Sequence, residues 1–159
     1  MGAGKTTLGT LVGGALIWPY IDNDQGLSTL NQMSIEEISQ LPVPELHALE
    51  MEYLRDVMSQ SGPFIAGVAA SVVDYPEGLT VLDSATVIYL RIPLDVILER
   101  AGTTGVGRQA LQEDPEKVAT ERFYRRDPLY RASADLTIDL TQSPEADAEK
   151  IISFLRTQQ

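Results

Sequence analysis

Apolar and polar positions alternate along the chain in a way that predicts helices separated by short strands. The clearest helix signal lies in 44–59, where apolar side chains recur every three or four residues along one face. Further helices are expected at 5–16, 94–100, 114–132 and 143–156. Short β-prone runs predict strands at 18–22, 63–67, 86–92 and 135–140. Strands that alternate with helices indicate an α/β fold with a mostly parallel sheet.

Helix-capping residues support several of these boundaries. Ser34 followed by Glu37 forms the capping-box pattern of a helix start. Ser143 fits the N-cap of the last helix, and Pro144 fits its first turn. Neither a repeat nor a linker divides the sequence, so we expect one domain over residues 1–159.

The strongest chemical signal is the run Gly-Ala-Gly-Lys-Thr-Thr at 2–7. Gly4, Lys5 and Thr6 fit the last three positions of the phosphate-binding motif G-x-x-x-x-G-K-[ST]. In that motif, backbone N–H groups cradle phosphate oxygens, the lysine binds the outer phosphates, and the hydroxyl binds Mg²⁺. The run therefore predicts nucleotide binding. The alternative is a flexible, glycine-rich N-terminus that binds nothing.

The first half of this motif, and the strand that leads into it, would lie upstream of Met1. We therefore expect the first strand of the fold to be missing from this chain. Its loss would leave a gap in the centre of a parallel sheet, with unpaired strand edges on both sides. The chain would then start at an internal methionine, or belong to a decayed paralogue that no longer folds around ATP.

Composition narrows the possible partners. The formal net charge is −11, from 12 basic and 23 acidic residues, which argues against a nucleic-acid or anionic-membrane partner. The sequence has no apolar run near the roughly 18 residues of a membrane span, and it has no cysteine. These features fit a cytoplasmic protein. The basic residues of the second half gather in one stretch, at Arg100, Arg108, Arg122, Arg125, Arg126 and Arg131.

Two carboxylates follow the first expected strand. Asp22 and Asp24 sit at alternate positions, so on an extended strand end they would share a face. Paired carboxylates opposite a phosphate-binding loop suit a water-mediated hold on Mg²⁺ and the alignment or deprotonation of an accepting hydroxyl. A simpler alternative is that Asp24 caps the helix after it.

Taken in order, these landmarks resemble the shikimate kinase family, small P-loop kinases related in fold to nucleoside monophosphate kinases. The resemblance runs from Met1 to Leu155 and rests on MGAGKTTLG at 1–9, IDND at 21–24, SIEEI at 34–38, Glu50, Arg100 with Arg108, RRDPLY at 125–130, and Ala134-Asp135. It implies a three-layer αβα P-loop NTPase fold and a monomeric enzyme that uses ATP and Mg²⁺. The implied reaction transfers the γ-phosphoryl group to a hydroxyl of shikimate, in aromatic amino acid biosynthesis.

The resemblance also implies roles for individual residues at the nucleotide. Lys5, Asp24 and Arg108 would be catalytic, and Thr6 with Asp22 would hold Mg²⁺. Arg108 would belong to a lid at about 102–113 and reach the transferring phosphate, unless it is a solvated surface arginine. The nucleotide would be bound by Gly2, Ala3, Gly4, Lys5, Thr6, Thr7, Arg100, Arg108 and Pro144, the last also being a usual residue at a helix start.

On the acceptor side, the resemblance implies that shikimate is bound by Asp24, His47, Gly67, Val68, Ala69 and Arg126. Arg126 would pair with its carboxylate. His47 stands where the family usually has an arginine, and a histidine offers a carboxylate one hydrogen bond where an arginine offers two. Val68 and Ala69 replace two of three family glycines, and Val68 would add a branched side chain at a close backbone approach.

These departures leave the acceptor open. They suggest weakened shikimate binding, or a kinase of another small polyol or sugar acid. His47 is alternatively a plain helix-surface residue. A catalytically silent nucleotide-binding paralogue is a third possibility.

Overall fold

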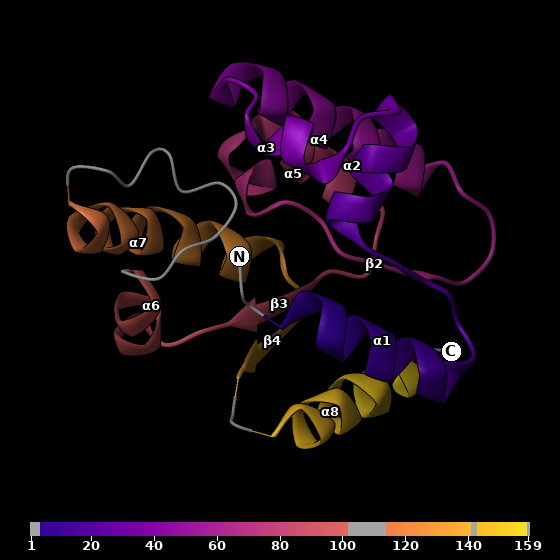
Figure 1. The fold of residues 1–159 in the computed structure, drawn as a ribbon. Helices are drawn as coiled ribbons and strands as arrows, with labels where there is room; N and C mark the ends of the chain where they lie inside the picture. The colour runs from indigo at the N-terminus through magenta and orange to yellow at the C-terminus, as the bar shows by residue number, and fades with distance from the viewer. Residues whose placement is uncertain (1–3, 102–113, 141–142, 159) are drawn as a thin grey trace.

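The computed structural model describes residues 4–101, 114–140 and 143–158, which form helices packed around short strands (Figure 1). The strands are β1 (Tyr20–Ile21), β2 (Ile65–Ala66), β3 (Ile88–Arg91) and β4 (Leu136–Asp139). The helices are α1 (Lys5–Leu16), α2 (Asn23–Asn31), α3 (Ile35–Ser39), α4 (Val43–Met58), the 3₁₀ helix η1 (Ala70–Asp74), α5 (Pro76–Leu82), α6 (Leu94–Ala101), α7 (Pro115–Ser133) and α8 (Pro144–Thr157).

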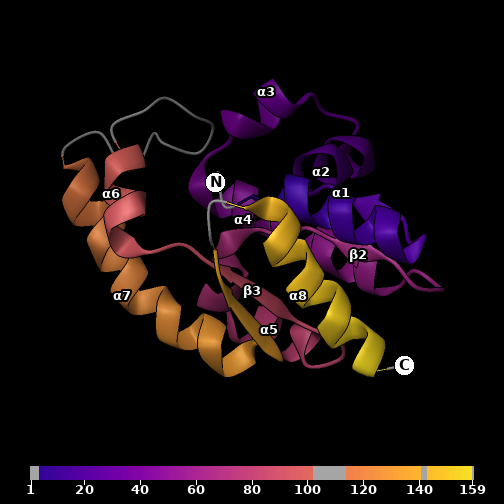
Figure 2. The same ribbon diagram turned by 90° about the horizontal axis from the view of Figure 1, so that it is seen from below.

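The strands pair in parallel, and helices cover both of their faces. β1 pairs with β2 and β3 pairs with β4, in registers that place Tyr20 opposite Ile65 and Ile88 opposite Leu136. Helices α1 and α8 pack together on one face, as Figure 2 shows from below, while α4 and α5 lie on the other. The predicted α/β fold with parallel strands and helices in outer layers is confirmed.

The core consists of three apolar clusters that hold these layers together. The first joins α1, α8 and β4 through Leu8, Val12, Ile138, Ala148, Ile151 and Leu155. The second joins α4 to η1 and α5, and the third joins α2, α3 and α4 around the buried Tyr53. Full burial of one such large side chain contributes roughly 1.5–3 kcal/mol. Both helical layers are therefore anchored to the strands by apolar packing.

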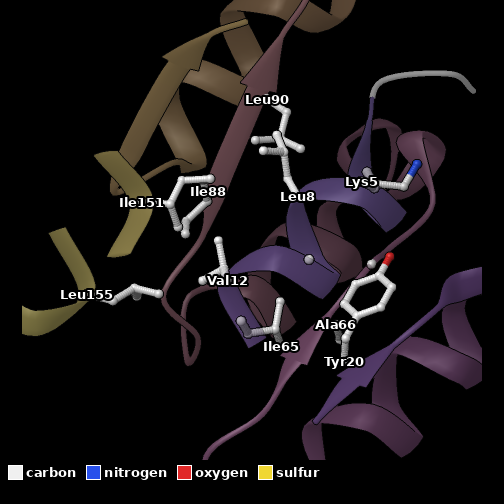
Figure 3. A pocket seen from close by; sticks show the side chains of 12 residues that line it. Lys5, Leu8, Val12, Tyr20, Ile65, Ala66, Ile88, Leu90, Ile151 and Leu155 are labelled. Atoms are coloured by element: carbon white, nitrogen blue, oxygen red, sulfur yellow. The ribbon is translucent and has the colours of Figure 1, made fainter. Parts of the chain in front are cut away.

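A break separates the two strand pairs. Among the described strands, β2 and β3 form no ladder with each other, so the pairs make two separate sheets. An apolar cavity lies between them, lined by β2, β3, α1 and α8 (Figure 3). Residues of β2 and of β3 line this cavity.

Most expected elements appear, but three do not follow the prediction. The first strand does not extend to Asp22, because the Asp22 side chain accepts hydrogen bonds from the backbone of Asp24 and Gln25 and so starts α2. Helix α2 was expected only in the alternative in which Asp24 caps a helix, and the η1–α5 stretch was not expected. The capping box at Ser34 and Glu37 is present as predicted. In the part of the chain that the structure describes, no helix has the length and apolarity of a membrane span.

Candidate functional site

Gly4 lies within the phosphate-binding run and caps helix α1. Its backbone is left-handed, with φ 72° and ψ 12°, which glycine adopts without strain. The Gly4 carbonyl accepts a hydrogen bond from Leu8 N at 2.9 Å and so begins the helix. Neither a side-chain cap nor an acidic residue occupies the first turn. The first N–H groups of α1 are therefore available to an anion, as at helix N-termini that bind phosphate.

Lys5 is the first residue of α1 and lines the cavity between the sheets. Figure 3 shows it at the end of the cavity away from Leu155, beside Tyr20. With the residues that the structure describes, Lys5 makes no ion pair. Its ammonium is thus an unpaired cation at a helix N-terminus, a suitable partner for phosphate oxygens.

Thr6 and Asp22 connect the start of α1 to the start of α2. Thr6 Oγ1 donates a hydrogen bond to Asp22 Oδ2 at 2.7 Å. Burial favours the protonated form of Asp22, but the hydrogen bonds from Thr6 and from the backbone of Gln25 and Asp24 outweigh it and lower the Asp22 pKa. An ionised carboxylate beside a hydroxyl is an oxygen ligand pair of the kind that Mg²⁺ prefers.

Asp24 lies in the first turn of α2, two residues beyond the position that caps it. The expected shared strand face for Asp22 and Asp24 is wrong, because the chain is already helical from Asn23. The alternative that Asp24 is the helix cap is also wrong, since Asp22 has that role. The Asp24 side chain is exposed and accepts a hydrogen bond from Asn23 Nδ2 at 2.9 Å. It is thus accessible to a small molecule.

Arg126, expected to bind an acceptor carboxylate, is held by Asp74. Its Nε lies 3.1 Å from both carboxylate oxygens, and its Nη2 lies 2.5 Å from Oδ2. Both side chains are largely buried, at 16% and 18% exposed. Burial lowers the Arg126 pKa, but the hydrogen bonds and charge of Asp74 more than offset this and raise it. The pair therefore stays ionised.

His47 is half-buried on α4, and its Nδ1 is hydrogen-bonded to the Tyr75 hydroxyl. The two rings also meet edge to face, with centroids 5.3 Å apart. His47 is therefore not a plain surface histidine. One turn on, Glu50 accepts a hydrogen bond from Ser71 Oγ. Burial raises the Glu50 pKa, against the opposing effects of Ser71 and of the charges on His47 and Arg126.

Gly67 and Val68 follow strand β2. A Cβ at Gly67 would lie 2.8 Å from the Tyr20 hydroxyl, and the Gly67 carbonyl accepts a hydrogen bond from Tyr53 at 3.0 Å. Glycine is therefore required there by close packing. The Val68 side chain packs against two core clusters, and its φ is not positive. The expectation that Val68 crowds a ligand is thus not supported, since its side chain belongs to the core. Ala69 caps η1.

The comparison with family models fits this geometry. The model of the shikimate kinase family matches residues 1–156. The chain belongs to the shikimate kinase family. The predicted membership is thus confirmed.

Known relatives of this family extend the match. The chain is 32% identical to the shikimate kinase of Thermosynechococcus vestitus over 158 residues, which covers 98% of the chain and 85% of that protein. A solved structure, shikimate kinase from Acinetobacter baumannii in complex with shikimate, has a TM-score of 0.85 and 26% identity over 100% of this chain and 90% of that one. The structure of shikimate kinase from Aquifex aeolicus has a TM-score of 0.81 and 25% sequence identity, and the match covers 99% of this chain and 93% of that one.

The structure describes only some of the other predicted site residues of this shikimate kinase family member. Gly2, Ala3, Arg108 and the expected lid at 102–113 lie outside the described residues. Thr7 is exposed on α1, and Arg100 is on α6. Pro144 is the first residue of α8, after the Ser143 cap.

Sequence reasoning missed the side chains behind the acceptor residues: Ser71, Asp74 and Tyr75. Each is bonded to a residue far away in the chain, and Asp74 is 52 positions from Arg126. A carboxylate directly before Tyr-Pro carries little local signal of such a partner. It could have been found only by asking which acidic side chain balances Arg126.

Proposed function

We propose that this shikimate kinase family member is an ATP-dependent kinase that transfers the γ-phosphoryl group of ATP to a hydroxyl of shikimate. The observation that carries the proposal is the hydrogen bond from Thr6 to Asp22. It joins the phosphate-binding turn to the first turn of α2, which carries Asp24. A donor site and a candidate acceptor site thus meet at two helix N-termini.

At the donor end, the residues present fit a nucleotide and a metal ion. The N-terminus of α1 and Lys5 would neutralise charge on the transferred phosphoryl group, which is the main demand of phosphoryl transfer. Thr6 and Asp22 would hold Mg²⁺, because this ion is usually bound through one or two protein oxygens together with substrate phosphates and water. When bound, Mg²⁺ would neutralise further phosphate charge.

In the transfer step, the acceptor hydroxyl oxygen forms a bond to the γ-phosphorus while the bond from that phosphorus to the β,γ-bridging oxygen breaks. ADP leaves with the electron pair of that bond. The exposed Asp24 carboxylate would align the hydroxyl and take its proton. Arg108 would add charge stabilisation as the lid arginine implied by the family.

At the acceptor end, Arg126 would bind the carboxylate of the acceptor, and His47 would also bind the acceptor. Gly67 and Ala69 would border the site with backbone. Val68 would contribute its backbone alone, since its side chain packs in the core. We further propose a monomer located in the cytoplasm.

A second candidate is a kinase of another polyol acid or sugar acid, and His47 favours it. His47 has one ring nitrogen engaged by Tyr75, so it can give an acceptor one hydrogen bond through the other. An arginine there would give two. The difference of one charge-assisted bond corresponds to roughly 1.5–3 kcal/mol, or about ten- to a hundredfold in affinity.

The test is ADP release in a coupled assay with ATP and Mg²⁺, with and without shikimate. Shikimate-dependent release supports the proposal. If ADP release depends on a sugar acid or cyclitol but not on shikimate, the second candidate is correct. Protein that binds no ATP by calorimetry contradicts both kinase assignments.

A further inference from the structure

The segment Ala70–Tyr75, which we call the η1 segment, lies behind the proposed acceptor residues. It comprises the 3₁₀ helix and the residue after it. Three of its side chains bind side chains of α4 and α7: Ser71 binds Glu50, Asp74 binds Arg126, and Tyr75 binds His47. Arg126 and His47 are proposed acceptor residues. One short segment therefore contacts side chains from both α4 and α7.

Asp74 binds one edge of the Arg126 guanidinium, the edge formed by Nε and Nη2, and does not bind the other. Among the described residues, Arg126 donates from Nε and Nη2 to Asp74, and its guanidinium also lies beside the Tyr130 hydroxyl. A guanidinium has five donors arranged on two edges, and either edge can bind a carboxylate with two parallel bonds. Asp74 thus does not engage the edge that contains Nη1.

The charge of Asp74 does not cancel the cation at this site. Arg125, which is 60% exposed, also donates to Asp74 Oδ2, at 3.1 Å. Arg122 lies one helical turn before Arg126, on the same face of α7. Glu50 adds a second carboxylate near Arg126. Three arginines thus lie with two carboxylates, and the cluster keeps a positive charge that can attract an anion.

Tyr75 fixes His47 in a comparable way. A tyrosine hydroxyl can donate to Nδ1 or accept from Nδ1–H. When it donates to a neutral imidazole, the ring proton is on Nε2, and the Nε2–H group is the donor that His47 can offer a ligand. Asp74 and Tyr75 are consecutive residues, so one turn of backbone sets the orientation of both proposed acceptor-binding side chains.

We propose that Asp74 and Tyr75 are positioning residues of the acceptor site: Asp74 turns the Nη1 edge of Arg126 toward the acceptor, and Tyr75 holds His47 as an Nε2–H donor. This inference rests on the proposed function for the identity of the acceptor residues. Neither residue touches the reacting atoms.

Kinetics provide the first test, with variants that remove each contact at constant size. Asp74→Asn and Tyr75→Phe should each raise KM for shikimate about tenfold, with kcat and KM for ATP nearly unchanged. Glu77→Gln is the matched control. Glu77 is three residues after Asp74, and its exposed carboxylate forms an ion pair with Arg55 that the substitution breaks. It should change neither KM. A fall in the shikimate KM of Asp74→Asn would mean that Asp74 competes with the acceptor, and it would overturn the proposal, as would an unchanged value.

Nitrogen NMR provides a readout that does not depend on the acceptor. His47 is the single histidine of the chain, so one imidazole spectrum reports its tautomer. We expect the Nε2–H tautomer in the wild type and its loss in Tyr75→Phe, and a slowly exchanging Arg126 Nε–H signal that Asp74→Asn removes. A mixture of tautomers in the wild type, or an Arg126 signal unchanged in Asp74→Asn, contradicts the proposal. If these NMR results hold but shikimate is not phosphorylated, the proposed function fails and the positioning role stands.

Discussion

The hydroxyl of Thr6 lies 2.7 Å from Oδ2 of Asp22, although the two residues are 16 positions apart. One is in the first turn of α1, and the other caps α2. The bond therefore aligns two helix N-termini on the same small region. It also places two oxygen atoms side by side, where we propose that Mg²⁺ binds.

Removing the Thr6 hydroxyl should impair the donor site. In Thr6→Val, which keeps the branched shape, we expect kcat/KM to fall roughly 100-fold, because an oxygen ligand and a partner of Asp22 are lost together. The measurement is ADP release at increasing Mg²⁺ concentrations. Thr10→Val, an exposed position one turn further along α1, is the control and should behave as wild type. Equal Mg²⁺ dependence in Thr6→Val and wild type would contradict the metal assignment.

Asp24 should matter for the chemical step and not for nucleotide binding. In Asp24→Asn we expect kcat to fall about 10²- to 10⁴-fold, as for the loss of a general base, with KM for ATP retained. Asp56→Asn, at an exposed carboxylate on α4, serves as the control. A rise in KM for ATP without loss of kcat would instead place Asp24 at the nucleotide.

Gly67 should resist substitution because of Tyr20. The new methyl of Gly67→Ala would lie 2.8 Å from the Tyr20 hydroxyl, so a shift is required, and we expect a loss of about 1–3 kcal/mol in the free energy of unfolding. Urea denaturation measures it. Adding Tyr20→Phe removes the oxygen and should recover part of the loss. Gly14→Ala, where a Cβ meets nothing within 4 Å in the helix interior, should stabilise by roughly 0.5–1 kcal/mol.

Asp127 should contribute stability that is lost in acid. It accepts hydrogen bonds from Arg91 at 2.8 Å, Arg131 at 2.9 Å and Tyr89 at 3.0 Å. Burial opposes ionisation, but these partners outweigh it and lower the Asp127 pKa. A lowered pKa in the folded state means that the stabilisation is present above the unfolded value near 3.9 and is lost as the pH falls through the folded value.

Asp127→Asn should therefore lose roughly 1.5–3 kcal/mol at neutral pH, as for a hydrogen bond to a charged group. Its unfolding free energy should also depend less on pH below about 4. Urea titrations from pH 7 to pH 3 measure both effects. Asp83→Asn, at an exposed carboxylate after α5, provides the baseline. Parallel pH profiles for Asp127→Asn and wild type would contradict the assignment.

How far the sequence predicts the structure depends on how local the signal is. Helix α1 has its predicted bounds, and the Ser34 capping box is present, because both depend on neighbouring residues. Helix α2 was expected only as an alternative, with Asp24 as its cap, because Asp22 was assigned to the end of the strand. The backbone at 22–24 can continue the strand or turn into a helix, and the pattern of apolar residues does not distinguish the two.

The candidate site divides in the same way. The phosphate-binding run is contiguous, so Gly4, Lys5 and Thr6 could be assigned from sequence. Asp74 and Tyr75 were missed because their partners lie 52 and 28 positions away, and only the packing of η1 against α4 and α7 brings them together. The order of the family's motifs indicated Arg126, but not the carboxylate that holds it.

The most direct test of the central claim is detection of the phosphorylated acceptor itself. Purified protein is incubated with ATP, Mg²⁺ and shikimate, and the acceptor is analysed by mass spectrometry and ³¹P NMR, with Lys5→Ala as the control. We predict a phosphate ester of shikimate that forms together with ADP in wild type and is strongly reduced in Lys5→Ala. Unmodified shikimate in the presence of protein that binds ATP, or an ester formed equally by Lys5→Ala, would contradict this account.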